Sequence, residues 1–201
     1  MNRPARTSPL SLTARIASVA VLLAGLTACA NQTLLSPVHL ENYDPQDLFY
    51  LANKGPVLTE VVGNPFDESK LLVDNRVTSA MTGANFFPKL TFDTKVPPEQ
   101  NSPYHVIVVL DAAGNTRPER LCANPRDADR PEASHSPGDA FRIVAVYCVN
   151  DRRLSSISGT APRPDNARDP RFVNLIRQAT LNLFPTDNPD RRDENRLRRL
   201  Q

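Results

Sequence analysis

The chain has 201 residues, of which 40% are hydrophobic and 23% charged, and these proportions suit one globular domain with appendages. Its formal net charge of +2 depends on three arginines near the N-terminus, because residues 1–28 contain no acid and the remainder has a net charge of −1. A near-neutral domain lacks the basic surface that nucleic-acid binding requires, and the absence of Trp argues against a large aromatic ligand cleft.

The N-terminus has the layout of an export signal. Basic, polar residues 1–15 precede an apolar run of 11 residues, Ile16 to Leu26. This run is too short to span a bilayer as a helix, which needs about 20 residues, but it fits the apolar region of a secretory signal. The next residues, Leu26-Thr27-Ala28-Cys29, resemble the lipobox of bacterial lipoproteins.

The lipobox resemblance implies a signal peptide over residues 1–28 that is cleaved between Ala28 and Cys29. It also implies diacylglycerol on the Cys29 sulfur and a further acyl chain, such as palmitate, on its new amine; several chains make a stable membrane anchor. Because Ala30 stands where an Asp would favour inner-membrane retention, we expect the outer membrane, facing the periplasm. The alternative is an ordinary cleaved signal in which Cys29 is a chance thiol.

Export also bears on the remaining cysteines. With Cys29 lipidated, Cys122 and Cys148 are left as a pair in an oxidising compartment, and we predict a disulfide between them. A zinc site is disfavoured because these two cysteines have no CxxC spacing and no paired histidines nearby.

The first part of the mature chain shows weak patterns. Residues 29–45 have no clear period, so we assign them to the lipidated cysteine and a flexible tether. Residues 47–53 and 56–62 are rich in strand formers and flank Lys54-Gly55, which predicts a hairpin. A helix is predicted at 67–82, with Asp67 as its cap and an apolar face that includes Met81 as core filler.

The second part contains the clearest strands. Residues 104–110 and 141–149 are apolar on both faces, which predicts two central strands of a sheet. Residues 89–94 alternate and predict a short strand. Asn150-Asp151 forms a turn, and the serine-rich residues 154–160 predict an exposed return strand at the sheet edge.

The last regular element is an amphipathic helix that begins with Asp169-Pro170 and ends near Phe184-Pro185. The fold class is therefore α/β, of the α+β type. We expect a single small mixed or antiparallel sheet of about four to six strands with two helices packed on it, over residues 46–185. Residues 186–201 form a charged, flexible tail in this interpretation.

A second resemblance covers Phe141 to Pro185, including Cys148. The strand, the turn, the serine- and glycine-rich return strand, Asp-Pro-Arg-Phe and the helix ending in Leu-Phe-Pro are similar to small proteobacterial lipoproteins of unknown function. This resemblance supports the membrane address, and it implies no activity and no site residues.

No catalytic signature stands out, so we predict no catalytic residues, no metal site and no cofactor. Ser155 and Ser156 lack a nucleophile motif, and His105, which opens a central strand, is conceivable as a general base but more typical of structure. The remaining candidates are two histidines and the charged residues of the long proline-rich loop at 111–139, which lacks a calcium-loop pattern: His39, His135, Arg126, Asp127, Asp129, Arg130, Glu132 and Asp139.

The sequence therefore predicts a membrane-anchored envelope lipoprotein with a non-enzymatic binding or accessory domain. Its expected partners are the membrane, through the lipid, and another envelope protein, through the 111–139 loop or the exposed 154–160 strand. The alternatives are an envelope hydrolase with an unrecognised site and a carrier of a lipid or other apolar ligand. The arginine-rich tail could also contact anionic headgroups.

Overall fold

A computed structural model of the chain describes residues 32–125 and 140–188. The folded unit begins at Thr33. Ala28, Cys29, His135 and the charged residues of the 126–139 stretch lie outside the described residues, so the predictions made for them keep the status of predictions.

The described residues contain a seven-stranded mixed sheet with the order β1-β7-β6-β5-β3-β4, in which β2 also pairs with β7. Only the β3–β4 and β3–β5 pairs are parallel. The predicted single α/β sheet is confirmed, but its predicted size is too small, because two-residue strands leave no period in a sequence. The strands are β1 (Leu34–Leu35), β2 (His39–Leu40), β3 (Val57–Val62), β4 (Phe92–Asp93), β5 (Tyr104–Leu110), β6 (Phe141–Val149) and β7 (Arg152–Ala161).

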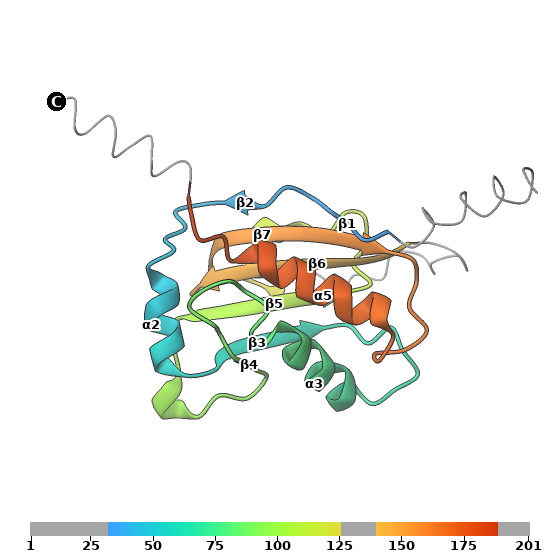
Figure 1. Ribbon diagram of the computed structural model, residues 1–201, viewed down its shortest axis with the longest axis horizontal. Helices are drawn as coiled ribbons and strands as arrows, with labels where there is room; N and C mark the ends of the chain where they lie inside the picture. Colours follow the sequence, from blue (N-terminus) through green and yellow to red (C-terminus); the bar gives the residue numbers. More distant parts are fainter. Residues whose placement is uncertain (1–31, 126–139, 189–201) are drawn as a thin grey trace, which may run out of the picture. The chain divides into compact units, whose positions relative to one another are not determined.

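Two long helices, α3 (Lys70–Met81) and α5 (Pro170–Leu183), lie on one face of the sheet, as predicted (Figure 1). A shorter helix, α2 (Asp47–Lys54), stands at one end of the sheet, and the single-turn α4 (Pro118–Leu121) contacts β6 and β7. Alternate residues of β5 and β6 enter two separate apolar clusters, one on each face of the sheet. These two strands have the predicted bounds because burial on both faces leaves a continuous apolar run.

The cluster on the face opposite α3 and α5 is closed by the disulfide between Cys122 and Cys148, which confirms the predicted pair. Cys122 follows α4, and Cys148 lies on β6, so the bond holds α4 against this face. Leu121 and Ile107 pack beside it and are almost fully buried.

Helix α2 replaces the strand predicted at 47–53, and β3 pairs in parallel with β5 instead of forming a hairpin. Leu48 and Leu51, three positions apart, are both buried, as expected for one face of a helix. Asp47 lies in its first turn, and Gly55, at φ 126°, ends it. The aromatic and apolar run Leu-Phe-Tyr-Leu suggested a strand, but these caps and the leucine spacing favour a helix.

Strand β7 is not an edge strand, contrary to the prediction. It pairs with β6 on one side and with β1 and β2 on the other, so residues 34–40 lie on the sheet rather than in a tether. At Gly159, an added Cβ would lie 2.7 Å from side-chain atoms of both Leu175 and Leu35. The small residues of β7 therefore allow α5 and the N-terminal segment to approach it closely.

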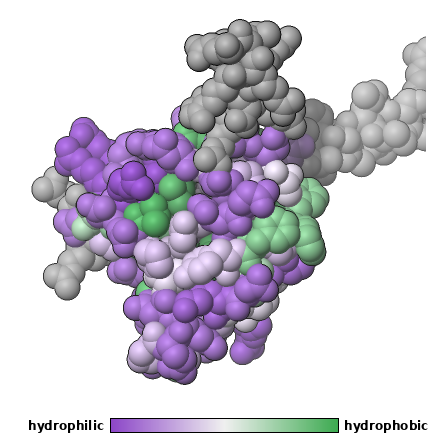
Figure 2. Space-filling model, turned by 90° about the vertical axis from the view of Figure 1, so that its left-hand side faces the viewer, coloured by the Kyte–Doolittle hydropathy of each residue, from purple (hydrophilic) through white to green (hydrophobic). Residues whose placement is uncertain are grey.

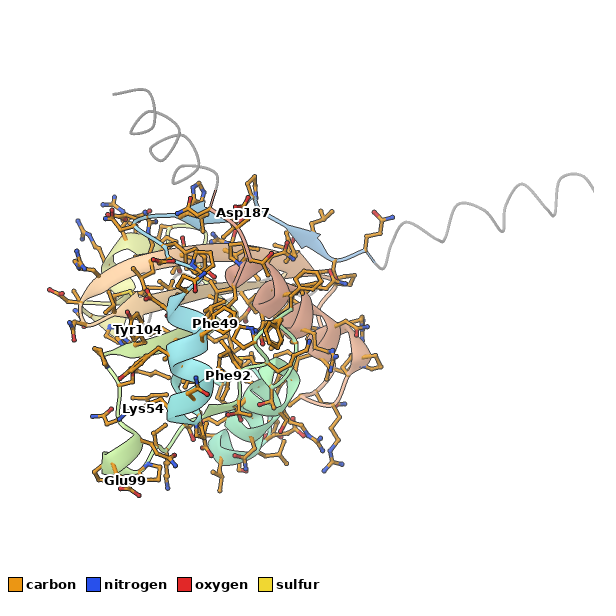
Figure 3. All side chains as sticks on the ribbon, turned by 60° about the vertical axis from the view of Figure 1, so that its left-hand side comes forward. Phe49, Lys54, Phe92, Glu99, Tyr104 and Asp187 are labelled. Atoms are coloured by element: carbon orange, nitrogen blue, oxygen red, sulfur yellow. A yellow bond between two sulfur atoms is a disulfide. The ribbon has the colours of Figure 1, made fainter. Side chains whose placement is uncertain are left out.

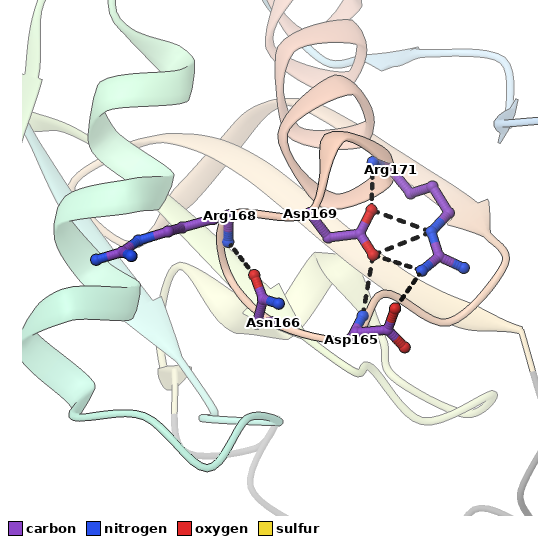
Figure 4. A network of polar contacts seen from close by, with 5 residues as sticks. All are labelled: Asp165, Asn166, Arg168, Asp169 and Arg171. Carbon is purple, nitrogen blue, oxygen red and sulfur yellow. Dashed lines mark hydrogen bonds and ion pairs between the residues drawn. The ribbon is translucent and has the colours of Figure 1, made fainter.

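The helix caps illustrate local chemistry. Ser69, not the predicted Asp67, caps α3 by accepting from the Leu72 N–H. Asp169 caps α5 as predicted, accepting from the Arg171 N–H at 2.8 Å. The Arg171 guanidinium also donates to Asp169 and to Asp165 (Figure 4). The Asp-Pro-Arg-Phe motif is thus explained by the start of α5, since Phe172 is fully buried in the core.

Candidate docking surface at the α2 end of the sheet

All four tyrosines of the chain gather at the α2 end of the sheet, joined by ring contacts. Tyr147 of β6 lies at their centre, stacked on Tyr104 at 5.8 Å and edge-on to Phe184 at 5.1 Å, with Phe184 against Phe92. Tyr104 in turn touches the half-exposed Tyr50 on α2. We call this set the tyrosine cluster: Tyr43, Tyr50, Phe92, Tyr104, Tyr147 and Phe184. It connects the core to the surface.

Polar groups within the tyrosine cluster are positioned individually. The Tyr43 hydroxyl donates to the Pro185 carbonyl at 2.8 Å, whereas the buried Tyr147 hydroxyl finds no hydrogen-bond partner among the described residues. Burial, aided by the negative charge of Asp47, raises the pKa of Tyr43, Tyr104 and Tyr147, and Tyr104 also bonds to that carboxylate. These phenols therefore remain protonated donors at neutral pH.

A second aromatic set faces solvent beside the same helix. Phe49 on α2 lies edge-on to Phe87, with their ring centroids 5.7 Å apart, and Phe86 adjoins them in sequence. Their exposed fractions are 43% for Phe49, 61% for Phe86 and 69% for Phe87. We call Phe49, Phe86 and Phe87 the phenylalanine patch.

The loop that carries Phe86 and Phe87 is closed by internal hydrogen bonds. Asn85 is fully buried; its side-chain amide donates to the Pro88 carbonyl, and its Oδ1 accepts from the Leu90 N–H. The Gly83 N–H donates to the Leu90 carbonyl at 2.9 Å, with Gly83 at φ 70°. Phe49, the partner of Phe87, is held by α2, which is anchored by the buried side chains of Leu48 and Leu51. The exposed rings are therefore held by ordered backbone.

The surface of this end of the domain is mixed. Figure 2 views the α2 side and shows apolar areas separated by hydrophilic residues. Figure 3 places Phe49, Phe92 and Tyr104 around α2, with Asp187 beyond the start of the helix and Glu99 beyond its end. Lys54, at the end of α2, donates to the Glu99 carbonyl. Apolar rings in a charged surround are typical of protein-binding surfaces.

The sequence-predicted candidates that lie in residues 32–125 and 140–188, namely Ser155, Ser156, His39 and His105, do not converge on a site. Ser155 is buried and its hydroxyl donates to the Leu183 carbonyl at 2.6 Å, while Ser156 is buried and contacts Arg153. The Ser155 hydroxyl therefore ties β7 to the end of α5, whereas the Ser156 contact lies within β7 itself. His39 is exposed on β2, opposite Ser156, where β2 pairs with β7.

His105 is half-buried at the start of β5. Burial lowers its pKa, although a hydrogen bond to Pro103 and the charge of Glu60 act in the opposite direction. In residues 32–125 and 140–188, no cluster of three or more His, Cys, Asp or Glu side chains is arranged to hold a metal ion.

Two surface hollows formed by described residues have no aromatic residue in their lining. One of about 360 Å³ follows α3 between Ser69 and Ser79, and one of about 270 Å³ lies along β3, next to Asp74 and Thr94. No helix in the described ranges is both long and apolar enough to cross a membrane.

Sequence reasoning missed this surface. Phe86-Phe87 fell between predicted elements, and the Phe49-Tyr50 pair was assigned to a strand. The available signal was the adjacent pair of phenylalanines in a loop, between Asn85 and Pro88.

No family profile and no curated protein matches the chain. Two solved structures, PelC dodecamers from Paraburkholderia phytofirmans, one of them a point variant, align with it at 9% identity and a TM-score of 0.38. The variant alignment covers 79% of this chain and 99% of that one; the other covers 76% and 97%. Likeness of this degree carries no argument about function.

Proposed function

We propose that the chain is the precursor of a membrane-anchored envelope lipoprotein whose folded domain is a non-enzymatic docking module. In this proposal Cys29 carries the lipid, the domain faces the periplasm from the outer membrane, and the phenylalanine patch binds another envelope protein. The observation that carries the docking role is the exposure of three phenyl rings on ordered elements.

The energetics favour a binding role for these rings. Burying a phenylalanine side chain contributes roughly 1.5–3 kcal/mol, so leaving Phe86 and Phe87 largely exposed forgoes a sizeable stabilisation of the fold. The same area becomes available when a partner covers it. Large, fixed aromatic side chains are among the residues that dominate binding energy in protein interfaces, because little conformational entropy is lost on contact.

The lipid anchor complements this role. An anchored domain meets other envelope proteins at high effective concentration, so a patch of three rings suffices for a specific contact of modest intrinsic affinity. The lipobox at Leu26 to Cys29 supports the anchor, and the disulfide suits the oxidising periplasm.

The test is in-cell crosslinking of the full-length protein, with captured partners identified by mass spectrometry. We compare the wild type with the double variant Phe86→Ser/Phe87→Ser and with Leu71→Ser. Leu71 is a matched control because it is 62% exposed but lies on α3, outside the patch. We expect the double variant to reduce capture of a discrete partner at least tenfold, and Leu71→Ser to leave it unchanged.

A Cys29→Ser variant separates the two parts of the proposal. Loss of membrane association in this variant supports the lipid anchor, and persistence of it contradicts the anchor. Equal capture by the wild type and by Phe86→Ser/Phe87→Ser would contradict the docking role of the patch, whatever the outcome for Cys29.

A further inference from the structure

The chain leaves the described domain beside the start of α2. Asn188 is buried, and its side-chain amide donates to the Tyr43 carbonyl at 2.7 Å. The Tyr43 hydroxyl in turn bonds to the Pro185 carbonyl. Two bonds therefore fix residues 185–188 against the residue that lies four positions before Asp47, where α2 begins.

The outer face of α2 is only partly covered by other described elements, since Phe87 contacts Phe49 and Tyr104 contacts Tyr50 from the side. Phe49 and Tyr50 are 43% and 48% exposed, and Ala52 and Asn53 are exposed beside them. Two carboxylates, Asp44 and Asp47, lie at the start of α2 and Lys54 lies at its end, so the negative charge is found at the start of the helix.

The segment that follows Asn188 has complementary chemistry. Residues 189–201 contain five arginines, and the last six, Arg-Leu-Arg-Arg-Leu-Gln, contain three arginines, two leucines and no acid. Arginine stacks on tyrosine and phenylalanine faces and pairs with carboxylates, and leucine packs on exposed rings. A strand of 13 residues spans about 43 Å, whereas α2, with eight residues, is only about 12 Å long, so the segment reaches every part of this face.

We propose that residues 196–201 dock in cis on the outer face of α2, where their arginines stack on Tyr50 and face the acidic start of the helix and their leucines cover Phe49. The attachment point at Asn188 makes this contact intramolecular, so its effective concentration is in the millimolar range even if each arginine contributes little. Phe49 belongs both to this contact and to the phenylalanine patch, whereas Phe86 and Phe87 lie on the loop. Substitutions at Phe86 and Phe87 therefore test partner binding, and substitutions in the arginine segment test the contact in cis.

The experiment places the photocrosslinker benzoylphenylalanine at Asn53 of the full-length, membrane-bound protein, and at Leu71 in a control. Digestion with a protease that spares arginine keeps residues 196–201 in one peptide for mass analysis. We expect a crosslink from position 53, but not from position 71, to residues 196–201. The triple variant Arg196→Glu/Arg198→Glu/Arg199→Glu should reduce its yield at least fivefold, as should 0.5 M salt.

A mixture of isotopically heavy and light protein distinguishes the sources of the peptide. Crosslinks within one isotopic form support docking in cis, and crosslinks between forms overturn it in favour of a second copy. Lipid adducts in place of the peptide, or a yield unaffected by the triple variant, also overturn the proposal. Repeating the measurement in Phe86→Ser/Phe87→Ser separates it from partner capture, because that variant should retain the full crosslink.

Discussion

The two ends of α5 rest on different kinds of aromatic core. Near its start, Phe66, Phe141 and Phe172 contact one another with centroids 5.2–6.1 Å apart. Outside this triangle the Arg163 guanidinium lies 5.9 Å from the Phe141 ring and is paired with Asp111. Beyond the last residue of α5, Phe184 contacts Tyr147, which is the centre of the tyrosine cluster, and Phe92.

The difference separates a closed core from one that extends to the surface. Phenyl rings have no hydrogen-bonding groups, so the three rings of the phenylalanine triangle are stabilised by burial alone. Tyrosine rings bring hydroxyl groups that must be satisfied, and only Tyr43 among the two deepest has a described acceptor. In return, the tyrosine cluster continues through Tyr104 to the exposed Tyr50. We infer that the first end serves stability and the second connects the fold to a surface.

The largest expected loss of stability comes from a substitution in the phenylalanine triangle near the start of α5. Phe172→Ala should lower the free energy of unfolding by about 3–5 kcal/mol, because it removes a fully buried ring and leaves a cavity. Phe87→Ala, at a ring that is 69% exposed, should change it by no more than about 0.5 kcal/mol. Urea unfolding of both variants measures this contrast, and similar losses would mean that the patch belongs to the core.

A smaller loss of unfolding free energy is expected when the disulfide on the opposite face of the sheet from Tyr147 is removed. Cys148 is adjacent to Tyr147 on β6 but faces the opposite side of the sheet, where it bonds to Cys122. The double variant Cys122→Ala/Cys148→Ala should lose about 2–4 kcal/mol, since the bond closes a loop with a sequence separation of 26 residues. Guanidinium unfolding measures the loss. Added reductant should destabilise the wild type but not this variant; an equal response in both would argue against the bridge.

The sequence predicts the closed end better than the end that reaches the surface. Strands β5 and β6 and helix α5 carry long apolar periods and the Asp169-Pro170 start, and their bounds match the prediction. The Cys122–Cys148 pair was also predicted, from the cysteine count and from the expectation of export. These elements are specified by burial, which appears directly as a pattern of apolar residues.

The tyrosine end depends on contacts between distant segments. Tyr43 and Pro185 are 142 positions apart, and β1 and β2 are held by pairing with β7, so no local period indicates them. In α2, eight residues are too few to separate a helix from a strand by periodicity alone. The phenylalanine patch was missed for this reason, because its members come from two separate segments, α2 and the loop that carries Phe86 and Phe87.

The cap that Asp169 provides at the start of α5 can be tested by the pH dependence of stability. The Arg171 guanidinium, together with backbone N–H donors, lowers the pKa of Asp169 from 3.8 to about 2. A carboxylate whose pKa is lowered in the folded state stabilises the fold above its ordinary pKa, and this contribution disappears as the pH falls through the lowered value. Asp169→Ala should therefore cost about 1–2 kcal/mol at neutral pH, as for other helix caps.

The pH profile provides the control for Asp169. The difference in unfolding free energy between the wild type and Asp169→Ala should shrink between about pH 4 and pH 2, because protonation removes the same interaction in the wild type. The matched variant Asp165→Ala, at an exposed carboxylate that also accepts from Arg171, should cost no more than about 0.5 kcal/mol. A difference that is constant with pH would assign the loss of stability in Asp169→Ala to packing alone.

The smallest expected change is a gain in the free energy of unfolding rather than a loss. Tyr147→Phe keeps the buried ring and its contacts with Tyr104 and Phe184 but removes a hydroxyl that has no partner among the described residues. A buried, unpaired hydroxyl opposes folding, so this variant should gain about 1 kcal/mol of stability. Tyr43→Phe, at a hydroxyl bonded to the Pro185 carbonyl, should instead lose about 1 kcal/mol. Urea unfolding of both variants reads the sign directly. A loss of stability in both variants would show that the Tyr147 hydroxyl is satisfied by water or by a residue outside the described ranges. Every deeply buried hydroxyl of the tyrosine cluster would then have a hydrogen-bond partner.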